Sequence, residues 1–129
     1  MNGKYLLDTS IIVELFAEDE VVIEQLRKTE STFIPCIAIG ELYYGARKST
    51  RQTENLKQVE RLVVTGVVLP CDGETGYWYG IVKDKLRRIG KPIPENDIWI
   101  AALALQHELI LATRDKHFEV VDGLETALW

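Results

Sequence analysis

The stretch Lys4-Tyr5-Leu6-Leu7-Asp8-Thr9-Ser10-Ile11-Ile12 decides the fold. Its first four residues form a short apolar run that is typical of a strand, and the polar residues after them can cap a helix that begins near Ile11. A strand that runs directly into a capped helix is the repeating unit of parallel α/β sheets. The segment therefore predicts a strand, a turn and a helix, with the carboxylate of Asp8 at the end of the strand.

The rest of the chain repeats this alternation. Apolar spacing and end signals predict further helices over about 21–28, 35–46, 51–62, 72–89 and 96–105, with Asp72 and Asn96 as caps. Further strands are predicted at 32–34, 67–69 and 109–112, the second of them buried on both sides. Parallel strands need crossover connections, which helices provide. We therefore predict an α/β fold, with a mainly parallel central sheet between two layers of helices.

Length and composition predict a single domain over residues 1–129. The chain has 129 residues and 47% hydrophobic content, which is enough for one core and too little for two. No run without Asp, Glu, Lys or Arg exceeds ten residues, whereas a membrane helix needs about twenty apolar ones. The first residues contain no uninterrupted apolar region of the kind that a secretory signal needs. We expect a cytoplasmic protein that makes no membrane contact.

The charge balance argues against binding of nucleic acid by electrostatics alone. The net charge is −5, so a polyanionic partner would need a local basic patch or a metal ion. Basic residues do gather in two stretches, which are either solvated helix faces or such a patch: Arg47, Lys48 and Arg51, and Lys83, Lys85, Arg87, Arg88 and Lys91. Cys36 and Cys71 lack metal-ligand spacing, and we predict buried free thiols rather than a disulfide.

Four widely separated acids, Asp8, Glu41, Asp97 and Asp115, are the best indication of function. Asp8 and Asp115 follow predicted strands, and ligands of parallel sheets gather at the carboxyl ends of the strands. Asp97 falls in the first turn of a helix, whose dipole stabilises an anion by about 0.3–1 kcal/mol. Glu41 lies beside the apolar face of its own helix and joins the others if that helix crosses the same edge.

Each acid also has a structural interpretation, as a helix cap, a first-turn acid, an exposed helix residue or a turn residue. If the four meet, their mutual repulsion calls for protons or a cation, and an all-oxygen ligand set selects Mg²⁺ or Mn²⁺. Zinc would favour Cys and His, which are absent from the motif positions. A cation held in this way supports transfer of a phosphoryl group to water.

Four segments together resemble the successive motifs of the PIN-domain family, most closely the VapC-type ribonuclease toxins of type II toxin-antitoxin systems. They are Leu6-Leu7-Asp8-Thr9-Ser10, Ile39-Gly40-Glu41-Leu42, Asn96-Asp97-Ile98-Trp99-Ile100-Ala101-Ala102 and Thr113-Arg114-Asp115-Lys116-His117-Phe118. The resemblance covers nearly the whole chain. It implies a PIN-like fold and a metal-dependent endoribonuclease with Mg²⁺ or Mn²⁺ at the catalytic, metal-holding acids Asp8, Glu41, Asp97 and Asp115.

The resemblance also implies RNA as the substrate, a homodimer, a small antitoxin as partner, and a supporting role for Thr113. Two other functions stay open: a catalytically inert PIN-fold binding module, and an aspartate-based phosphotransfer domain. The second fits poorly, because Ser10 stands where such enzymes favour another Asp. We predict no catalytic role for His107 or His117. The aromatic residues either stack RNA bases or pack in the core and at interfaces: Tyr43, Tyr44, Tyr77, Trp78, Tyr79 and Trp99.

Overall fold

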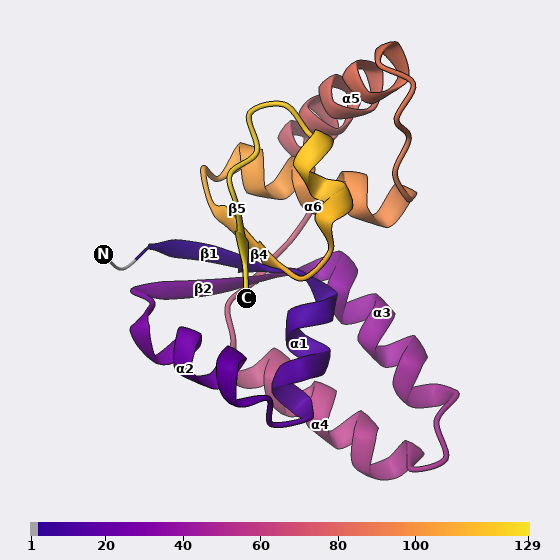
Figure 1. Cartoon of the computed structure of the whole chain (residues 1–129). Coiled ribbons are helices and arrows are strands. Elements are labelled where there is room, and N and C mark those ends of the chain that lie inside the picture. The colour runs from indigo at the N-terminus through magenta and orange to yellow at the C-terminus, as the bar shows by residue number, and fades with distance from the viewer. Residues whose placement is uncertain (1–2) are drawn as a thin grey trace.

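A five-stranded parallel sheet forms the centre of the computed structural model, which describes residues 3–129. The strand order is β3-β2-β1-β4-β5, and every neighbouring pair is parallel (Figure 1). The strands are β1 (Lys4–Leu7), β2 (Ser31–Pro35), β3 (Val68–Leu69), β4 (Ile110–Thr113) and β5 (Thr126–Leu128). The predicted α/β fold with a mainly parallel sheet is confirmed.

Helices cover both faces of this sheet (Figure 1). One face carries α1 (Thr9–Phe16), α2 (Glu20–Lys28), α3 (Cys36–Arg47) and α4 (Gln52–Thr65). The other carries α5 (Gly73–Arg88), α6 (Glu95–Gln106) and the short 3-10 helix η1 (Lys116–Val120). The architecture is therefore the three-layer sandwich that the sequence predicts. None of the described helices combines the length and the apolar character that crossing a membrane requires.

Two hydrophobic cores lie on opposite faces of the sheet, and the strands contribute to both in alternation. Leu6 packs in the core beneath α5 and α6, and its neighbour Leu7 packs in the core beneath α1 and α3. Both side chains are at least 97% buried, and burial of one leucine stabilises the fold by about 1.5–3 kcal/mol. This two-sided burial explains why the central strands are apolar at successive positions.

Helix α6 is buried around most of its circumference because it lies between the sheet and α5. Six of its residues are buried, and three of them are alanines, whose small side chains allow close packing: Ile98, Ile100, Ala101, Ala102, Leu103 and Ala104. The N-terminal end of α6, which carries Asp97, is thereby fixed against the edge of the sheet at which β1 and β4 end.

Several local predictions are wrong. Strand β3 contacts both cores, through Leu69 and Val68, but as an edge strand it is only half-buried. Asn96 does not cap α6, because the helix already begins at Glu95, after Pro94. Strand β4 extends to Thr113, which was expected in the loop. Strand β5 and η1 were not predicted. The capping roles of Asp8 and Asp72 are confirmed.

Candidate active site at the carboxyl edge of the sheet

Neighbouring parallel strands bring Asp8 and Asp115 together across most of the chain. Leu7 at the end of β1 pairs with Ala112 of β4, so the residues that follow each strand are adjacent. The buried Thr113 hydroxyl donates a hydrogen bond to Asp8 Oδ2 at 2.8 Å and accepts one from the Asp115 amide at 2.9 Å. Thr113 therefore connects the two acids.

Helix α3 brings Glu41 to the same edge. The Thr9 hydroxyl, beside Asp8 in the first turn of α1, donates to Glu41 Oε1 at 2.6 Å. The side-chain amide of Asn96, at the start of α6, donates to Glu41 Oε2 at 3.3 Å. Glu41 is thus tied to the two segments that carry Asp8 and Asp97, although the sequence could not show that α3 crosses here.

The imidazole of His117 bridges the remaining two acids. Its Nε2 lies 2.9 Å from Asp97 Oδ2, and its Nδ1 lies 2.6 Å from Asp115 Oδ1. These three side chains offer ligand atoms that all lie within 4.8 Å of one another. Two carboxylates need two protons for these contacts, which an imidazolium supplies alone and a neutral ring supplies with a protonated carboxyl.

Sequence reasoning missed His117 as part of this site. Its position two residues after Asp115 is the signal that could have revealed it, because η1 begins between them and turns the ring back toward the acid. Asp115 Oδ1 also accepts a hydrogen bond from the His117 amide at 3.1 Å, which fixes this turn. Contacts through Thr9, Asn96, Thr113 and His117 therefore join all four predicted acids in one network.

Burial and neighbouring negative charges raise the pKa values of Asp8 and Asp97. Burial raises the pKa of Asp8, whose side chain is 5% exposed, although Thr113, Ser10 and the Thr9 amide hydrogen-bond to its carboxylate. Burial likewise raises the pKa of Asp97, and the negative charges of Asp8 and Glu41 raise it further against the opposing effect of His117. The effect of Asp8 and Glu41 on Asp97 is what is expected of negative charges that lie close together.

The donor set fits a divalent cation. Carboxylate oxygens are the preferred ligands of Mg²⁺ and Mn²⁺, and a cation would offset the cost of ionising Asp8 and Asp97, whose pKa values are raised first by burial and then by neighbouring negative charge. His117 adds an imidazole that the sequence-based comparison with zinc left out. Donor chemistry alone therefore no longer excludes zinc, and the excess of oxygen donors is what favours the harder ions.

An apolar groove leads away from the acids between α1, α3 and α4. It begins at the hydrogen-bonded pair Thr9 and Glu41, and its volume is about 430 Å³. Its other lining residues are largely apolar, among them Val13, Phe16, Leu42, Ala46 and Val59. Such a groove suits the apolar side chains of a bound peptide or ligand next to the acidic site.

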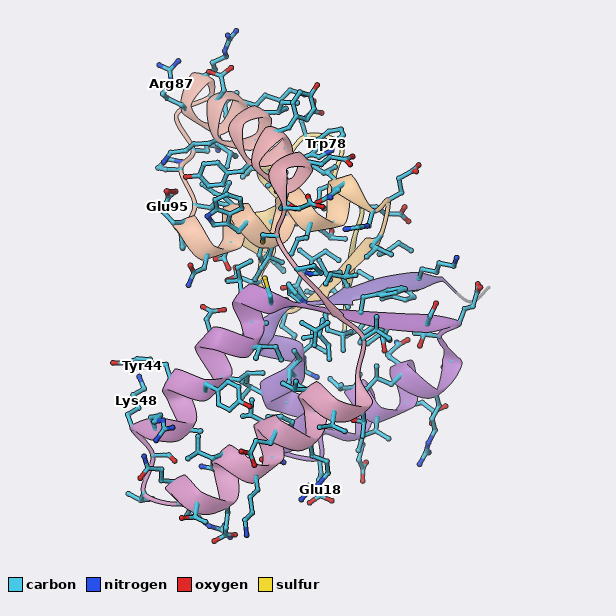
Figure 2. All side chains as sticks on the ribbon, turned by 180° about the vertical axis from the view of Figure 1, so that it is seen from behind. Glu18, Tyr44, Lys48, Trp78, Arg87 and Glu95 are labelled. Atoms are coloured by element: carbon cyan, nitrogen blue, oxygen red, sulfur yellow. The ribbon has the colours of Figure 1, made fainter. Side chains whose placement is uncertain are left out.

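The two basic stretches differ in their surroundings. Four of the five basic residues in the second stretch pair with acids, which favours a solvated helix face: Lys83 with Glu95, Lys85 with Asp122, and Arg87 and Arg88 with Asp84. In the first stretch, Arg51 also pairs with Glu54, and Lys48 lies 4.9 Å from the ring of Tyr44, a residue that is 67% exposed on α3 (Figure 2). Exposed Tyr44 is therefore placed to contact a ligand or a partner.

Tyr79 and Trp99 take part in packing. Their rings stack with centroids 4.2 Å apart, and they join α5 to α6. The hydroxyl of Tyr79 donates to Glu95, at the start of α6. These contacts support the interpretation of the two aromatic residues as structural, whereas Tyr77, 64% exposed, stays available for an interface.

Comparison with known proteins identifies the family. The PIN domain family model matches residues 5–124. The chain is 33% identical to Ribonuclease VapC2 of Haemophilus influenzae and to the tRNA(fMet)-specific endonuclease VapC of Shigella flexneri, with 98% of each chain covered in both cases. The VapBC-1 structure from nontypeable Haemophilus influenzae superposes with a TM-score of 0.89 at 28% identity over 98% of both chains. These similarities extend over nearly the whole chain, which also carries the cluster of acids at the carboxyl edge of its sheet. The chain therefore belongs to the PIN-domain family, among proteins of the VapC type.

Proposed function

We propose that this protein is a metal-dependent endoribonuclease, the toxin of a toxin-antitoxin pair, that hydrolyses RNA phosphodiesters. The observation that carries the proposal is the single network joining Asp8, Glu41, Asp97 and Asp115 at the carboxyl edge of the sheet. Relatives at 33% identity that are named ribonuclease and tRNA endonuclease support this choice of reaction. Residues 1–129 form one nuclease domain, which acts in the cytoplasm.

The four acids hold Mg²⁺ or Mn²⁺. When bound there, such an ion stabilises negative charge on a phosphodiester and makes a water molecule more acidic. The raised pKa of Asp8 and of Asp97 supports this assignment, because burial, and to a smaller extent neighbouring negative charge, makes their ionisation costly and a cation would offset that cost. Asp115 and Glu41 remain accessible to solvent, unlike the members of a buried ion pair that serves only the fold. A polymer can therefore approach the site.

Neighbouring polar groups hold the acids in place. Thr113 and Ser10 donate to one oxygen of Asp8, and the Thr9 amide donates to the other, so this carboxylate has a fixed orientation. The same contacts argue against the phosphotransfer alternative, because a carboxylate that acts as a nucleophile needs a free oxygen aimed at the phosphorus. Thr113 is thus a positioning residue, and His117 is another, since it fixes Asp97 and Asp115 relative to each other.

An antitoxin and a second copy of the chain are the proposed partners. The apolar groove begins at Glu41, so a peptide segment of an antitoxin that fills it would lie beside the acids and exclude RNA. The VapBC-1 structure supports the assignment of an antitoxin partner. Exposed apolar side chains supply surface for the homodimer, and the best candidates are Tyr77 at 64% and Val64 at 83% exposure.

Incubation of the purified chain with total cellular RNA tests the proposal. Cleavage is expected with Mg²⁺ or Mn²⁺ and not with excess chelator, and mapping of the new RNA ends identifies the substrate. Equal cleavage in chelator would reject the metal-dependent mechanism. RNA that stays intact in both ions, with a protein that still binds Mn²⁺, would favour the inert binding module.

A further inference from the structure

The two cysteines face each other at the ends of neighbouring strands. Pro35 of β2 pairs in register with Leu69 of β3, so the residues that follow these strands emerge side by side. Cys36 follows Pro35 directly, and Cys71 comes two residues after Leu69. Their sulfur atoms lie 3.7 Å apart although the residues are separated by 35 positions. Both thiols are free, but Cys71 is exposed and Cys36 is partly so, which corrects the prediction of buried thiols.

We propose that Cys36 and Cys71 form a reversible thiol-disulfide site that exchanges with small-molecule disulfides. A disulfide has a sulfur-sulfur bond of about 2.05 Å, so the two sulfur atoms need to approach by less than about 2 Å. Cys36 is held in the first turn of α3, whereas Cys71 belongs to the connection between β3 and α5. Cys71 is exposed and lies outside both β3 and α5, so its side chain is free to move toward Cys36.

The surroundings assign different roles to the two sulfur atoms. Although Cys71 is largely exposed, partial burial, contact with Cys36 and the charge of Asp72 raise the pKa of its thiol to about 12, so this thiol keeps its proton at neutral pH. Cys36, the first residue of α3, faces this protonated thiol. Cys36 is therefore the thiol that attacks first, and Cys71 is the thiol that resolves the product.

The exchange balances in two steps. Cys36 releases its proton to solvent, and its thiolate attacks a small disulfide, which forms a mixed disulfide and expels one small thiolate that takes up a proton. Cys71 then loses its proton and attacks the sulfur of Cys36, expelling the second small thiol. Two protein thiols are oxidised to one disulfide, and one small disulfide is reduced to two thiols.

The bond would join the start of α3 to the connection that carries the chain from one helical layer to the other (Figure 1). It closes a loop of 35 positions, which restricts the unfolded chain and stabilises the fold. Among the described residues, no hydrogen bond joins either sulfur atom to the four acids, so this inference goes beyond the proposed nuclease function and does not rest on it. Oxidation is expected to raise the apparent melting temperature by roughly 5–15 °C.

Oxidised glutathione, added in excess to the reduced full chain, provides the test. The expected product is a monomer that has lost the mass of two hydrogen atoms, has no free thiol and melts at higher temperature, and dithiothreitol reverses all three changes. Cys36→Ser and Cys71→Ser serve as matched controls, because each retains one thiol. Either variant is expected to gain at most one glutathione and to show no rise in melting temperature of this size.

Three results would overturn the proposal. The native chain would then carry two glutathione molecules without resolving them, or would form disulfides only between chains on a non-reducing gel, or would keep both thiols free. These outcomes are read on the native protein, so poor folding of a serine variant leaves the test intact. RNA cleavage is not among the measurements, and failure of the nuclease proposal is therefore distinguishable from failure of this one.

Discussion

Asp8 and Asp72 have the same local role and opposite electrostatics. Each caps a helix, Asp8 by accepting from the Thr9 amide and Asp72 by accepting from the Thr75 amide. Hydrogen bonds from Thr75, first from its amide, and from Gln106 lower the pKa of the exposed Asp72, whereas burial raises that of Asp8. A cap that faces water is stabilised as a carboxylate, and a cap buried among other acids is not.

The difference shows how a structural acid is distinguished from a functional one in this fold. Capping and the contact with Gln106 explain Asp72, because its Oδ1 accepts hydrogen bonds from Thr75 and Gln106 and no other carboxylate is among the causes of its pKa shift. Capping leaves Asp8 with an unrelieved cost of ionisation, to which Asp115 contributes. A cation bound at the site would offset that cost. Replacement of an acid of the network, such as Asp8, should therefore have different consequences from replacement of Asp72.

The largest difference is expected in RNA cleavage. Asp97→Asn and Asp8→Asn each remove a charge from the network and should lower the cleavage rate by roughly 10²-fold or more, because electrostatic stabilisation of the transition state is lost. Asp72→Asn should leave the rate unchanged. Initial rates on one RNA substrate, with circular dichroism as a check of folding, measure this. An equal loss in Asp72→Asn would remove the distinction between the two regions.

A smaller effect is expected from Thr113, which positions Asp8 and contacts no substrate in this proposal. Thr113→Val keeps the shape and removes the hydroxyl that donates to Asp8 at 2.8 Å, so kcat should fall about 10-fold with little change in KM. Thr113→Ser restores a donor and should recover most of the rate. The valine and serine variants are compared at saturating RNA, and equal activity of the two would show that the hydroxyl is dispensable.

Binding of Mn²⁺ should separate the two caps by a few degrees. A ligand that binds only the folded state stabilises it by about 2.7 kcal/mol at one hundred times its dissociation constant. The melting temperature of the native protein should therefore rise with Mn²⁺, and Asp8→Asn should show a smaller rise. Asp72→Asn is the matched control and should respond as the native protein does. Identical shifts in all three proteins would place the ion elsewhere.

Local sequence signals predicted the caps but not the convergence of the acids. A strand followed directly by Asp8, and a helix preceded by Asp72, are short-range patterns whose outcome depends on a few residues. The meeting of Asp8 with Asp115 depends instead on the register of β1 against β4, between residues 105 positions apart. The resemblance to a known family predicted that the four acids share one site. The residues alone did not establish that they meet.

The errors have physical causes of the same kind. Cys71 was expected in a core because it follows an apolar run, but that run is an edge strand and the chain leaves it toward solvent. His117 was set aside as a loop residue, and the turn of η1 directs it to Asp97 and Asp115. Strand β5 has three residues and no apolar run of its own, so its pairing with β4 determines it.

The smallest expected effect is a difference in stability without metal, and its sign reverses between the two regions. The raised pKa of Asp97 means that its ionisation destabilises the fold as pH rises through the native pKa, so Asp97→Asn in chelator should melt about 1–3 °C above the native protein at pH 7. The lowered pKa of Asp72 means that its carboxylate stabilises the fold at neutral pH, so Asp72→Asn should melt below the native protein.

Acidification should abolish both differences in melting temperature, the gain of Asp97→Asn and the loss of Asp72→Asn. The advantage of Asp97→Asn is lost as pH falls through the raised native pKa toward the ordinary carboxyl value of 3.8, because the native acid is then protonated and uncharged. The deficit of Asp72→Asn persists to lower pH and fades only as pH falls through a native pKa that lies below 3.8. Melting curves between neutral and acid pH in chelator measure both. A variant Asp97→Asn that is less stable than the native protein at pH 7 would show that the contact with His117 outweighs burial and repulsion, and that the acidic edge is satisfied without a cation.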